Sequence, residues 1–307
     1  MRVEFAGIEL RNPVIAASGT FAYGIEFEDI VALERIGGFV TKGISREPMA
    51  GNPSPRIIET ASGMMNAIGL QNIGVKAFIE KKLPALRKYP KCVVIVNVFG
   101  STVNDYVEVI RQLNDAEGIA AYELNASCPN TQHGGMAFGA DSAALDDLVL
   151  RAKQASSRPL IVKLSPNVTS IAAMAKCAAG AGADALSLIN TFVGLSIDIQ
   201  TRRSRIANVT GGLSGPAIKP MAVRMVWEAA NAVSIPILGI GGIVAPEDAV
   251  EFLLAGATGV QVGTASYADP RAVVRIAKGL QGWCTRHHIE RVGDLTGKFE
   301  AAAAPQA

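Results

Sequence analysis

The sequence predicts an α/β fold, a single (β/α)8 TIM barrel over residues 1–307, with a short N-terminal hairpin and long loops at the C-terminal face. Short apolar runs rich in branched residues alternate with amphipathic segments along almost the whole chain. Most of the runs are apolar on both faces, as is typical of parallel strands covered by helices. No repeat other than the βα unit, and no linker, indicates a second domain.

The expected strands number eight, and each is followed by a helical pattern. They are Val14–Ala17, Phe39–Lys42, Val93–Val98, Ala121–Leu124, Leu160–Leu164, Ala185–Ile189, Ile235–Ile240 and Gly259–Val262. This regular alternation favours a closed barrel over an open sheet.

Amphipathic segments between the strands predict the helices. Apolar residues recur at helical spacing after the polar start Ser101-Thr102, and again after Thr169, a candidate N-cap. A third apolar stripe starts at Ile218, and Pro246 suits the first turn of a helix that runs toward Ala255.

Three further segments are expected outside the βα units. Residues 2–10 alternate around Gly7 and predict a hairpin at the bottom of the barrel. The connections 45–73 and 190–216 are long, and both follow strands, on the face where barrel enzymes keep their active sites. Long structureless loops inside a compact domain are usually functional.

Composition excludes several classes of function. A net charge of +2 provides no basic stripe for nucleic acid. No segment approaches the ~18 apolar residues of a membrane span, and the first residues do not resemble a signal peptide. The four cysteines lack CxxC spacing, so neither a zinc site nor an iron–sulfur cluster is expected in this chain. Free cysteines without a secretion signal favour the cytoplasm.

Polar residues follow the expected strands at their carboxyl ends, which converge on one mouth of a barrel. In strand order they are Ser18, Lys42-Gly43, Asn97, Asn125, Lys163, Asn190-Thr191, Gly241-Gly242 and Gly263-Thr264. One lysine at a strand end is usually a paired or snorkelling side chain. Two lysines beside several amides instead indicate a pocket for a flat, anionic, hydrogen-bonding ligand.

The glycines after the seventh and eighth strands stand where barrels often hold a phosphate on backbone N–H groups. Gly215, just before a helix that starts near Ala217, could add another N–H to the same anion. No GxGxxG follows a strand, so a dinucleotide-binding fold is not supported.

The segment Asn125-Ala126-Ser127-Cys128-Pro129-Asn130 places a cysteine in a loop directly after an expected strand. Pro129 favours an extended backbone at Cys128 and so gives the thiol a fixed direction. A lone cysteine is more often a buried apolar residue. A thiolate can nevertheless act as a base if its pKa is pulled below ~8.5.

With Cys128, Lys42, Lys163 and the phosphate glycines together, the chain resembles the dihydroorotate dehydrogenases, FMN barrel enzymes of pyrimidine synthesis. The resemblance spans nearly the whole chain and is carried by residues 17–20, 66–72, 125–130, 162–167, 189–191 and 210–220. The membrane-attached class of this family uses serine as the base and has an amphipathic N-terminal extension. This chain has Cys128 and few residues before its first expected strand, and so resembles the soluble class. Residues 133–139 resemble the class 1B, NAD-linked catalytic subunit.

This resemblance implies oxidation of (S)-dihydroorotate to orotate on one FMN per chain, with Cys128 as the base and Lys163 beside the flavin. Implied substrate-binding residues are Lys42, Asn66, Ala67, Ile68, Gly69, Leu70, Asn125, Asn190 and Thr191. Implied FMN-binding residues are Ser18, Lys42, Gly43, Asn97, Asn125, Lys163, Ile189, Gly215, Gly241, Gly242, Gly263 and Thr264.

Class 1B also implies a partner, an electron-transfer subunit that carries FAD and a 2Fe-2S cluster and reduces NAD. Two subunits of each kind are expected in a heterotetramer. Three alternatives remain open: a class 1A-like enzyme that uses fumarate, a Schiff-base aldolase acting through Lys163, and a barrel that only binds a phosphorylated ligand.

Overall fold

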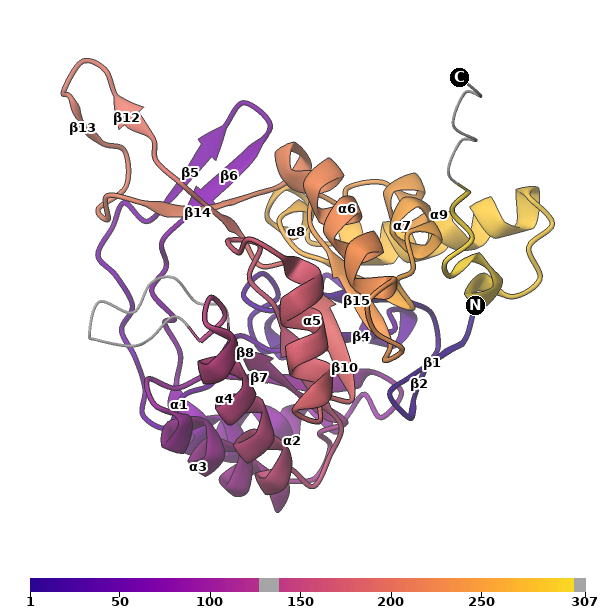
Figure 1. Cartoon of the computed structure of the whole chain (residues 1–307), viewed down its shortest axis with the longest axis horizontal. Coiled ribbons are helices and arrows are strands. Elements are labelled where there is room, and N and C mark those ends of the chain that lie inside the picture. The colour runs from indigo at the N-terminus through magenta and orange to yellow at the C-terminus, as the bar shows by residue number, and fades with distance from the viewer. Residues whose placement is uncertain (127–137, 301–307) are drawn as a thin grey trace.

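The computed structural model describes residues 1–126 and 138–300, and its centre is a closed parallel barrel (Figure 1). The strands follow one another around the barrel in the order β10-β15-β16-β3-β4-β7-β8-β9. Their bounds are β3 Val14–Ala16, β4 Gly38–Val40, β7 Val93–Val98, β8 Ala121–Asn125, β9 Leu160–Lys163, β10 Ala185–Leu188, β15 Ile237–Ile240 and β16 Gly259–Val262. All eight predicted strands are therefore confirmed, with ends that differ by at most two residues.

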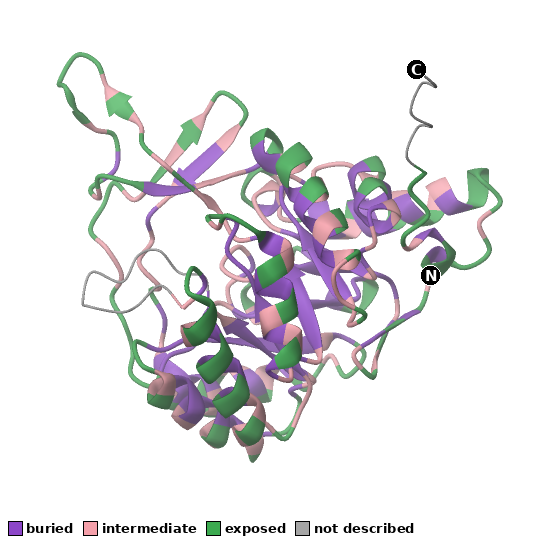
Figure 2. Ribbon diagram, in the orientation of Figure 1, coloured by how far each residue is buried: buried purple, intermediate pink, exposed green. Residues whose placement is uncertain are grey.

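Helices surround the barrel, and their buried faces point toward it while their outer faces are exposed (Figure 2). They are α1 Gly74–Ala77, α2 Leu83–Leu86, α3 Val103–Asn114, α4 Ser142–Ala155, α5 Ile171–Gly180, α6 Lys219–Ala230, α7 Pro246–Leu254, α8 Ala265–Ala268 and α9 Ala272–Arg286. Within the described ranges, no helix is both long and apolar enough to cross a membrane.

The helix starts illustrate how local sequence sets the boundaries. The Thr102 hydroxyl accepts a hydrogen bond from the Asp105 N–H, and the Asp105 carboxylate accepts one from the Thr102 N–H, which forms a capping box at α3. At α5 the predicted cap was one residue early: Ser170, not Thr169, accepts from the Ala173 N–H at 3.2 Å. Pro246 occupies the first turn of α7 as predicted.

The N-terminal hairpin is present as β1 (Val3–Phe5) paired antiparallel with β2 (Ile8–Leu10). Val3, Phe5 and Leu10 are buried in the main apolar core, so the hairpin packs onto the barrel through one face.

The prediction that 45–73 and 190–216 are structureless loops is wrong. They contain β5 (Ile57–Thr60), β6 (Gly63–Asn66), β11 (Phe192–Gly194) and β14 (Gly211–Ser214), which form one antiparallel sheet in the order β11-β14-β6-β5. A smaller hairpin pairs β12 (Ile197–Asp198) with β13 (Arg203–Ser204). In Figure 1 both hairpins project from one corner of the barrel.

Candidate active site

A pocket lies where the carboxyl ends of the barrel strands meet the four-stranded antiparallel sheet. Of the residues singled out in the sequence, the following line it: Ser18, Lys42, Gly43, Asn66, Ile68, Gly69, Leu70, Asn125, Lys163, Ile189, Asn190, Thr191, Gly215, Gly241, Gly242, Gly263 and Thr264. Segments as far apart in the chain as Ser18 and Thr264 thus converge on one cavity, as barrel geometry requires.

The two pocket lysines have no counter-charge in the described structure. Lys163 ends β9 and is only 7% exposed, and Lys42 follows β4 and is half-buried. Neither side chain forms a hydrogen bond or an ion pair with any residue that the structure describes. The described lining of the pocket contains no aspartate, glutamate or histidine.

Burial, together with the nearby Arg56 guanidinium, holds the pKa of Lys42 below its ordinary value. Desolvated cations are costly unless an anion meets them. The pocket is therefore built for a ligand that carries negative charge.

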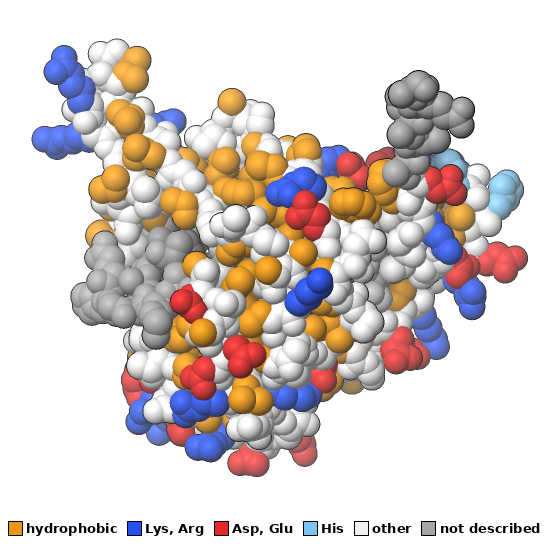
Figure 3. Space-filling view, viewed as in Figure 1, with side chains coloured by type: hydrophobic (Ala, Val, Ile, Leu, Met, Phe, Trp, Pro, Cys, Tyr) orange, Lys and Arg blue, Asp and Glu red, His pale blue; other side chains and the backbone are white. Residues whose placement is uncertain are grey.

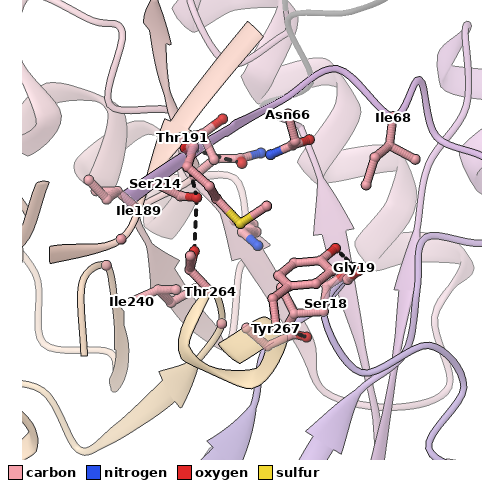
Figure 4. A pocket seen from close by; sticks show the side chains of 18 of the residues that line it. Ser18, Gly19, Asn66, Ile68, Ile189, Thr191, Ser214, Ile240, Thr264 and Tyr267 are labelled. Atoms are coloured by element: carbon pink, nitrogen blue, oxygen red, sulfur yellow. Dashed lines mark hydrogen bonds between the residues drawn. The ribbon is translucent and has the colours of Figure 1, made fainter. Parts of the chain in front are cut away.

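Amides and hydroxyls line the two sides of the same cavity. Figure 4 shows Asn66, Thr191 and Ser214 on one side, facing Thr264 and Tyr267 on the other. Asn190 Oδ1 accepts from the Thr191 N–H at 2.8 Å, which fixes the orientation of the Asn190 amide. Amides present both donors and acceptors, so this lining suits a heterocycle that alternates the two.

The backbone segments that follow β14, β15 and β16 lie close together at one side of the pocket. Gly242 has a φ of 72°, and a Cβ there would lie 2.9 Å from the Gly215 carbonyl oxygen. The Thr264 hydroxyl donates to Ser214 Oγ at 2.8 Å and so ties the end of β16 to β14 (Figure 4). Gly215 directly precedes the helical turn that leads into α6. Such glycine backbone at a helix N-terminus is typical of a phosphate site.

A buried polar network, which sequence reasoning missed, lies in the barrel interior below the pocket. Glu123 on β8 is fully buried and accepts three hydrogen bonds. The donors are Asn97 Nδ2 at 2.8 Å, Ser187 Oγ at 2.9 Å and Gln261 Nε2 at 2.7 Å, from β7, β10 and β16. Asn97 Oδ1 and Gln261 Oε1 have no hydrogen-bond partner among the described residues.

Two of the predicted binding residues do not line the pocket. Asn97 pairs in register with Glu123 and points its amide nitrogen toward that carboxyl group, while its amide oxygen lies next to the pocket-lining Gly43. Ala67 is fully buried on the opposite face of the antiparallel sheet, against Met65 and Ile206, because successive side chains leave a strand on opposite faces.

Several lining residues were not anticipated from the sequence, notably Met64, Ser214 and Tyr267. Met64 stands two residues before Asn66 on β6, so a strand prediction there would have placed both on one face. Tyr267 lies on the short helix α8 and donates its hydroxyl to the Gly19 carbonyl at 3.2 Å.

Cys128, the predicted base, lies outside the described residues. The nearest described positions are Ala126 before it and Phe138 after it. Asn125, at the end of β8, lines the pocket and is followed by the segment that carries this cysteine.

Comparison with known proteins identifies the family. A family model described as dihydroorotate dehydrogenase matches residues 1–283. The chain belongs to the dihydroorotate dehydrogenase family. The family expected from the sequence is thereby confirmed.

Individual dihydroorotate dehydrogenases align over nearly the whole chain. The dihydroorotate dehydrogenase B (NAD(+)) catalytic subunit of Geobacter sp. (strain M21) is 56% identical over 300 residues, which is 98% of each chain. The protein of the same name from Pelobacter propionicus is 55% identical over 300 residues, again 98% of each chain. A putative dihydroorotate dehydrogenase A (fumarate) of Solibacter usitatus is 58% identical over 294 residues, 96% of each chain.

The family implies FMN, and the described pocket fits this group. FMN joins a flat hydrogen-bonding ring to a phosphate. For the first, the described lining offers amides and two lysines that no described acidic residue neutralises; for the second, it offers glycine backbone at a helix N-terminus. No acidic side chain in the described lining would repel the phosphate.

Proposed function

We propose that this chain oxidises (S)-dihydroorotate to orotate in de novo UMP synthesis, using one bound FMN. The observation that carries the proposal is the pair Lys42 and Lys163, which have no counter-charge among the described residues and face an amide-lined pocket at the C-terminal end of the barrel. Relatives 55 to 56% identical over the same span are named dihydroorotate dehydrogenase B (NAD(+)), catalytic subunit.

The cofactor would be held from two ends. Its phosphate would lie against the backbone of Gly215, Gly241, Gly242, Gly263 and Thr264. Its ring would be bounded by Ser18, Lys42, Gly43, Asn125, Lys163 and Ile189. All of these residues line the pocket. Asn97 lies below these residues: its Nδ2 donates to Glu123, and its Oδ1, which has no partner among the described residues, lies next to Gly43.

The substrate would occupy the part of the pocket beneath the antiparallel sheet. Asn66, Asn125, Asn190 and Thr191 would bind its ring, whose amide groups alternate donors and acceptors. Lys42 and the backbone around Gly69 would bind its carboxylate, with Ile68 and Leu70 closing the side. We leave Ala67 out of this set because its side chain is buried on the far face of the sheet.

FMN, when bound, supplies the hydride acceptor. Cys128 would remove the proton from the neighbouring ring carbon of dihydroorotate. The Lys163 ammonium would offset negative charge that develops at the pyrimidine edge of the ring system. A thiolate base requires that water be kept out while the proton moves, and a loop closing over the substrate would do this.

The test is anaerobic addition of dihydroorotate to the purified yellow protein. Rapid bleaching of the flavin supports the proposal, and a protein that stays yellow contradicts it. Cys128→Ala should keep FMN but bleach about 10² to 10⁴ times more slowly, the usual worth of a general base. Cys128→Ser should retain some activity, displaced to higher pH. Cys177→Ala is the matched control and should bleach normally.

The Cys128 thiol can be labelled selectively with an alkylating reagent, because the three described cysteines are poor nucleophiles. Burial raises the pKa of Cys92 to about 12 and also raises the pKa values of Cys177 and Cys284. Iodoacetamide at pH 6–7 should therefore label Cys128 first. Protection of that thiol by orotate would support its place in the substrate site, and equal labelling with and without orotate would argue against it.

Electrons would leave through a separate subunit that carries FAD and a 2Fe-2S cluster and reduces NAD, in an assembly of two plus two chains. The word "subunit" in the names of the relatives supports such a partner. Fumarate as the oxidant is the second candidate, favoured by the similarity to the protein of Solibacter usitatus. Reoxidation of the isolated bleached chain by fumarate would select that candidate, and NAD reduction only with the partner would select the first.

We infer a cytoplasmic location, which the free state of the three described cysteines supports.

A further inference from the structure

Lys219 and Asp248 join the first turns of two neighbouring helices, α6 and α7. Lys219 Nζ lies 2.7 Å from Asp248 Oδ1 and 2.7 Å from Glu251 Oε2, which stands one turn farther along α7. Asp248 is buried, at 9% exposure, and Lys219 is half-buried. Neither side chain belongs to the described lining of the pocket, so the two can act on a ligand only through the backbone that they hold.

The Asp248 carboxylate also fixes the segment that joins β15 to α7. Its Oδ2 accepts hydrogen bonds from the N–H groups of Val244 and Ala245, each at 2.8 Å. Arg275 on α9 donates to the Val244 carbonyl at 3.2 Å. This segment directly follows residues 241–242, the glycines that line the pocket after β15. The path of these glycines is therefore set at its far end by Asp248.

The two backbone segments that Lys219 and Asp248 hold are in direct contact beside the pocket. A Cβ on Gly242 would lie 2.7 Å from Lys219 Cβ and 2.9 Å from the Gly215 carbonyl oxygen. Gly215 leads into α6, and Gly242 lies in the segment that leads into α7. The ion pair spans the same two helix starts outside the pocket, so it sets how far apart the glycines stand.

Both members of the pair carry charge at neutral pH. Hydrogen bonds to Asp248 and Glu251 raise the pKa of Lys219. Burial by itself would raise the pKa of Asp248, but Lys219 and the two backbone N–H groups outweigh it and hold this pKa below its ordinary value. A buried ion pair contributes little net stability, because desolvation offsets most of the attraction. Its hydrogen bonds are nevertheless short and directional, so such a pair is suited to fixing geometry.

We propose that Lys219 and Asp248 are positioning residues for the phosphate group of FMN. They hold the backbone of Gly215 and of Gly241 and Gly242 at the spacing that one phosphate bridges. The proposal rests on the proposed function, which supplies FMN as the ligand. A pair that served only to stabilise the fold would affect every ligand of the pocket alike, whereas a positioning pair affects the binding of the phosphate alone.

The test compares FMN with riboflavin, which has the same ring system and lacks the phosphate. The full-length chain is freed of flavin, and the dissociation constant of each compound is measured from the change in flavin fluorescence on binding. Asp248→Asn keeps the size of the side chain and should weaken FMN binding about tenfold or more, since the loss of one hydrogen bond to a charged group has at least that effect. Riboflavin binding should change by less than about twofold.

Lys219→Met keeps the length of the side chain without its charge, and it provides the test if Asp248→Asn does not fold. It should show the same selective loss of FMN affinity. The control is Glu228→Gln. Glu228 pairs with Arg224 on the outer face of α6, where Figure 3 shows basic and acidic side chains next to one another. Neutralising this acid should leave both dissociation constants within about twofold of wild type.

Selective loss of FMN affinity in the two variants supports the proposal. Equal weakening of FMN and riboflavin overturns it, because the pair would then only stabilise the barrel, and unchanged affinity for both compounds overturns it as well. A wild-type chain that binds riboflavin as tightly as FMN also overturns it, because the phosphate then contributes nothing. A wild-type chain that binds FMN selectively but is not bleached by dihydroorotate overturns the proposed function and leaves the positioning role intact.

Discussion

Replacement of Glu123 by leucine should destabilise the barrel by a large fraction of its free energy of unfolding. The carboxylate is fully buried and receives donors from β7, β10 and β16, so it links three strands that are far apart in sequence. Leucine accepts none of these hydrogen bonds. An unsatisfied buried donor costs about 1–3 kcal/mol, and the Ser187 hydroxyl alone can rotate to another acceptor. Two donors, on Asn97 and Gln261, then remain unsatisfied, so the expected loss is about 2–6 kcal/mol, against a total of roughly 5–15 kcal/mol for a folded domain.

Glu123→Gln should cost far less, because the network contains an acceptor that is not used. Gln261 Oε1 has no partner among the described residues, so the Gln261 amide can turn over and present this oxygen to the new amide N–H. Asn97 Nδ2 keeps its acceptor on the new carbonyl, and the Ser187 hydroxyl can accept instead of donating. A loss of about 1–2 kcal/mol follows, because the network keeps its hydrogen bonds only after the Gln261 amide and the Ser187 hydroxyl have reoriented.

Urea unfolding followed by circular dichroism measures both changes as shifts in the midpoint at constant slope. Glu59→Gln is the matched control, since Glu59 is exposed on β5, and it should stay within about 0.5 kcal/mol of wild type. A Glu123→Leu protein within about 1 kcal/mol of wild type would refute the reasoning, because it would mean that the donors find other acceptors.

Three further predictions concern the pocket. Lys163→Ala should lose FMN on gel filtration, whereas the exposed control Lys176→Ala should stay yellow; a yellow, fully active Lys163→Ala protein would contradict the assignment. Because the pKa of Lys42 is lowered, this side chain loses its charge at a pH below 10.5, so the affinity for orotate should fall as the pH rises through that value, and Lys42→Ala should abolish the fall. Between the lowered pKa and 10.5 the unfolded chain binds the proton more strongly than the folded one, so the contribution of Lys42 to the free energy of unfolding should rise with pH. Gly242→Ala, with a φ of 72° and a Cβ 2.9 Å from a backbone oxygen, should destabilise the protein by about 1–3 kcal/mol, while Gly293→Ala, which meets nothing within 4 Å, should not; equal melting curves would count against the strain.

The barrel was predictable because each of its strands is an apolar run that stands alone in the sequence. The limits of the runs were less predictable, since hydrogen-bond partners decide where a strand begins. The run at 235–240 starts as a strand only at Ile237, because Pro236 has no N–H to donate to a neighbouring strand.

The antiparallel sheet was missed because its strands do not have the composition of strands. Gly211 and Gly212 open β14, and glycine is usually unfavourable there. The structure shows why Gly212 is required: a Cβ at this position would lie 2.1 Å from Thr191 Oγ1. Its partner β6 is about 150 residues away in the chain, so no local pattern could indicate the pairing.

The polar residues of the site were largely identified from the sequence, but their depth in the barrel was not. Register decides depth: Asn125 pairs with Lys163 at the rim, and Asn97 pairs with Glu123 one layer lower. Asn97 looked like a rim residue because it nearly ends its apolar run, and Glu123 was passed over because it lies inside one. In the lower layer the Glu123 carboxyl group accepts from neutral donors, whereas in the upper layer Lys163 has no partner within residues 1–126 and 138–300. The lower layer therefore stabilises the barrel, and the upper layer binds the ligand. For this reason Glu123→Leu should change the free energy of unfolding, whereas Lys163→Ala should change the retention of FMN.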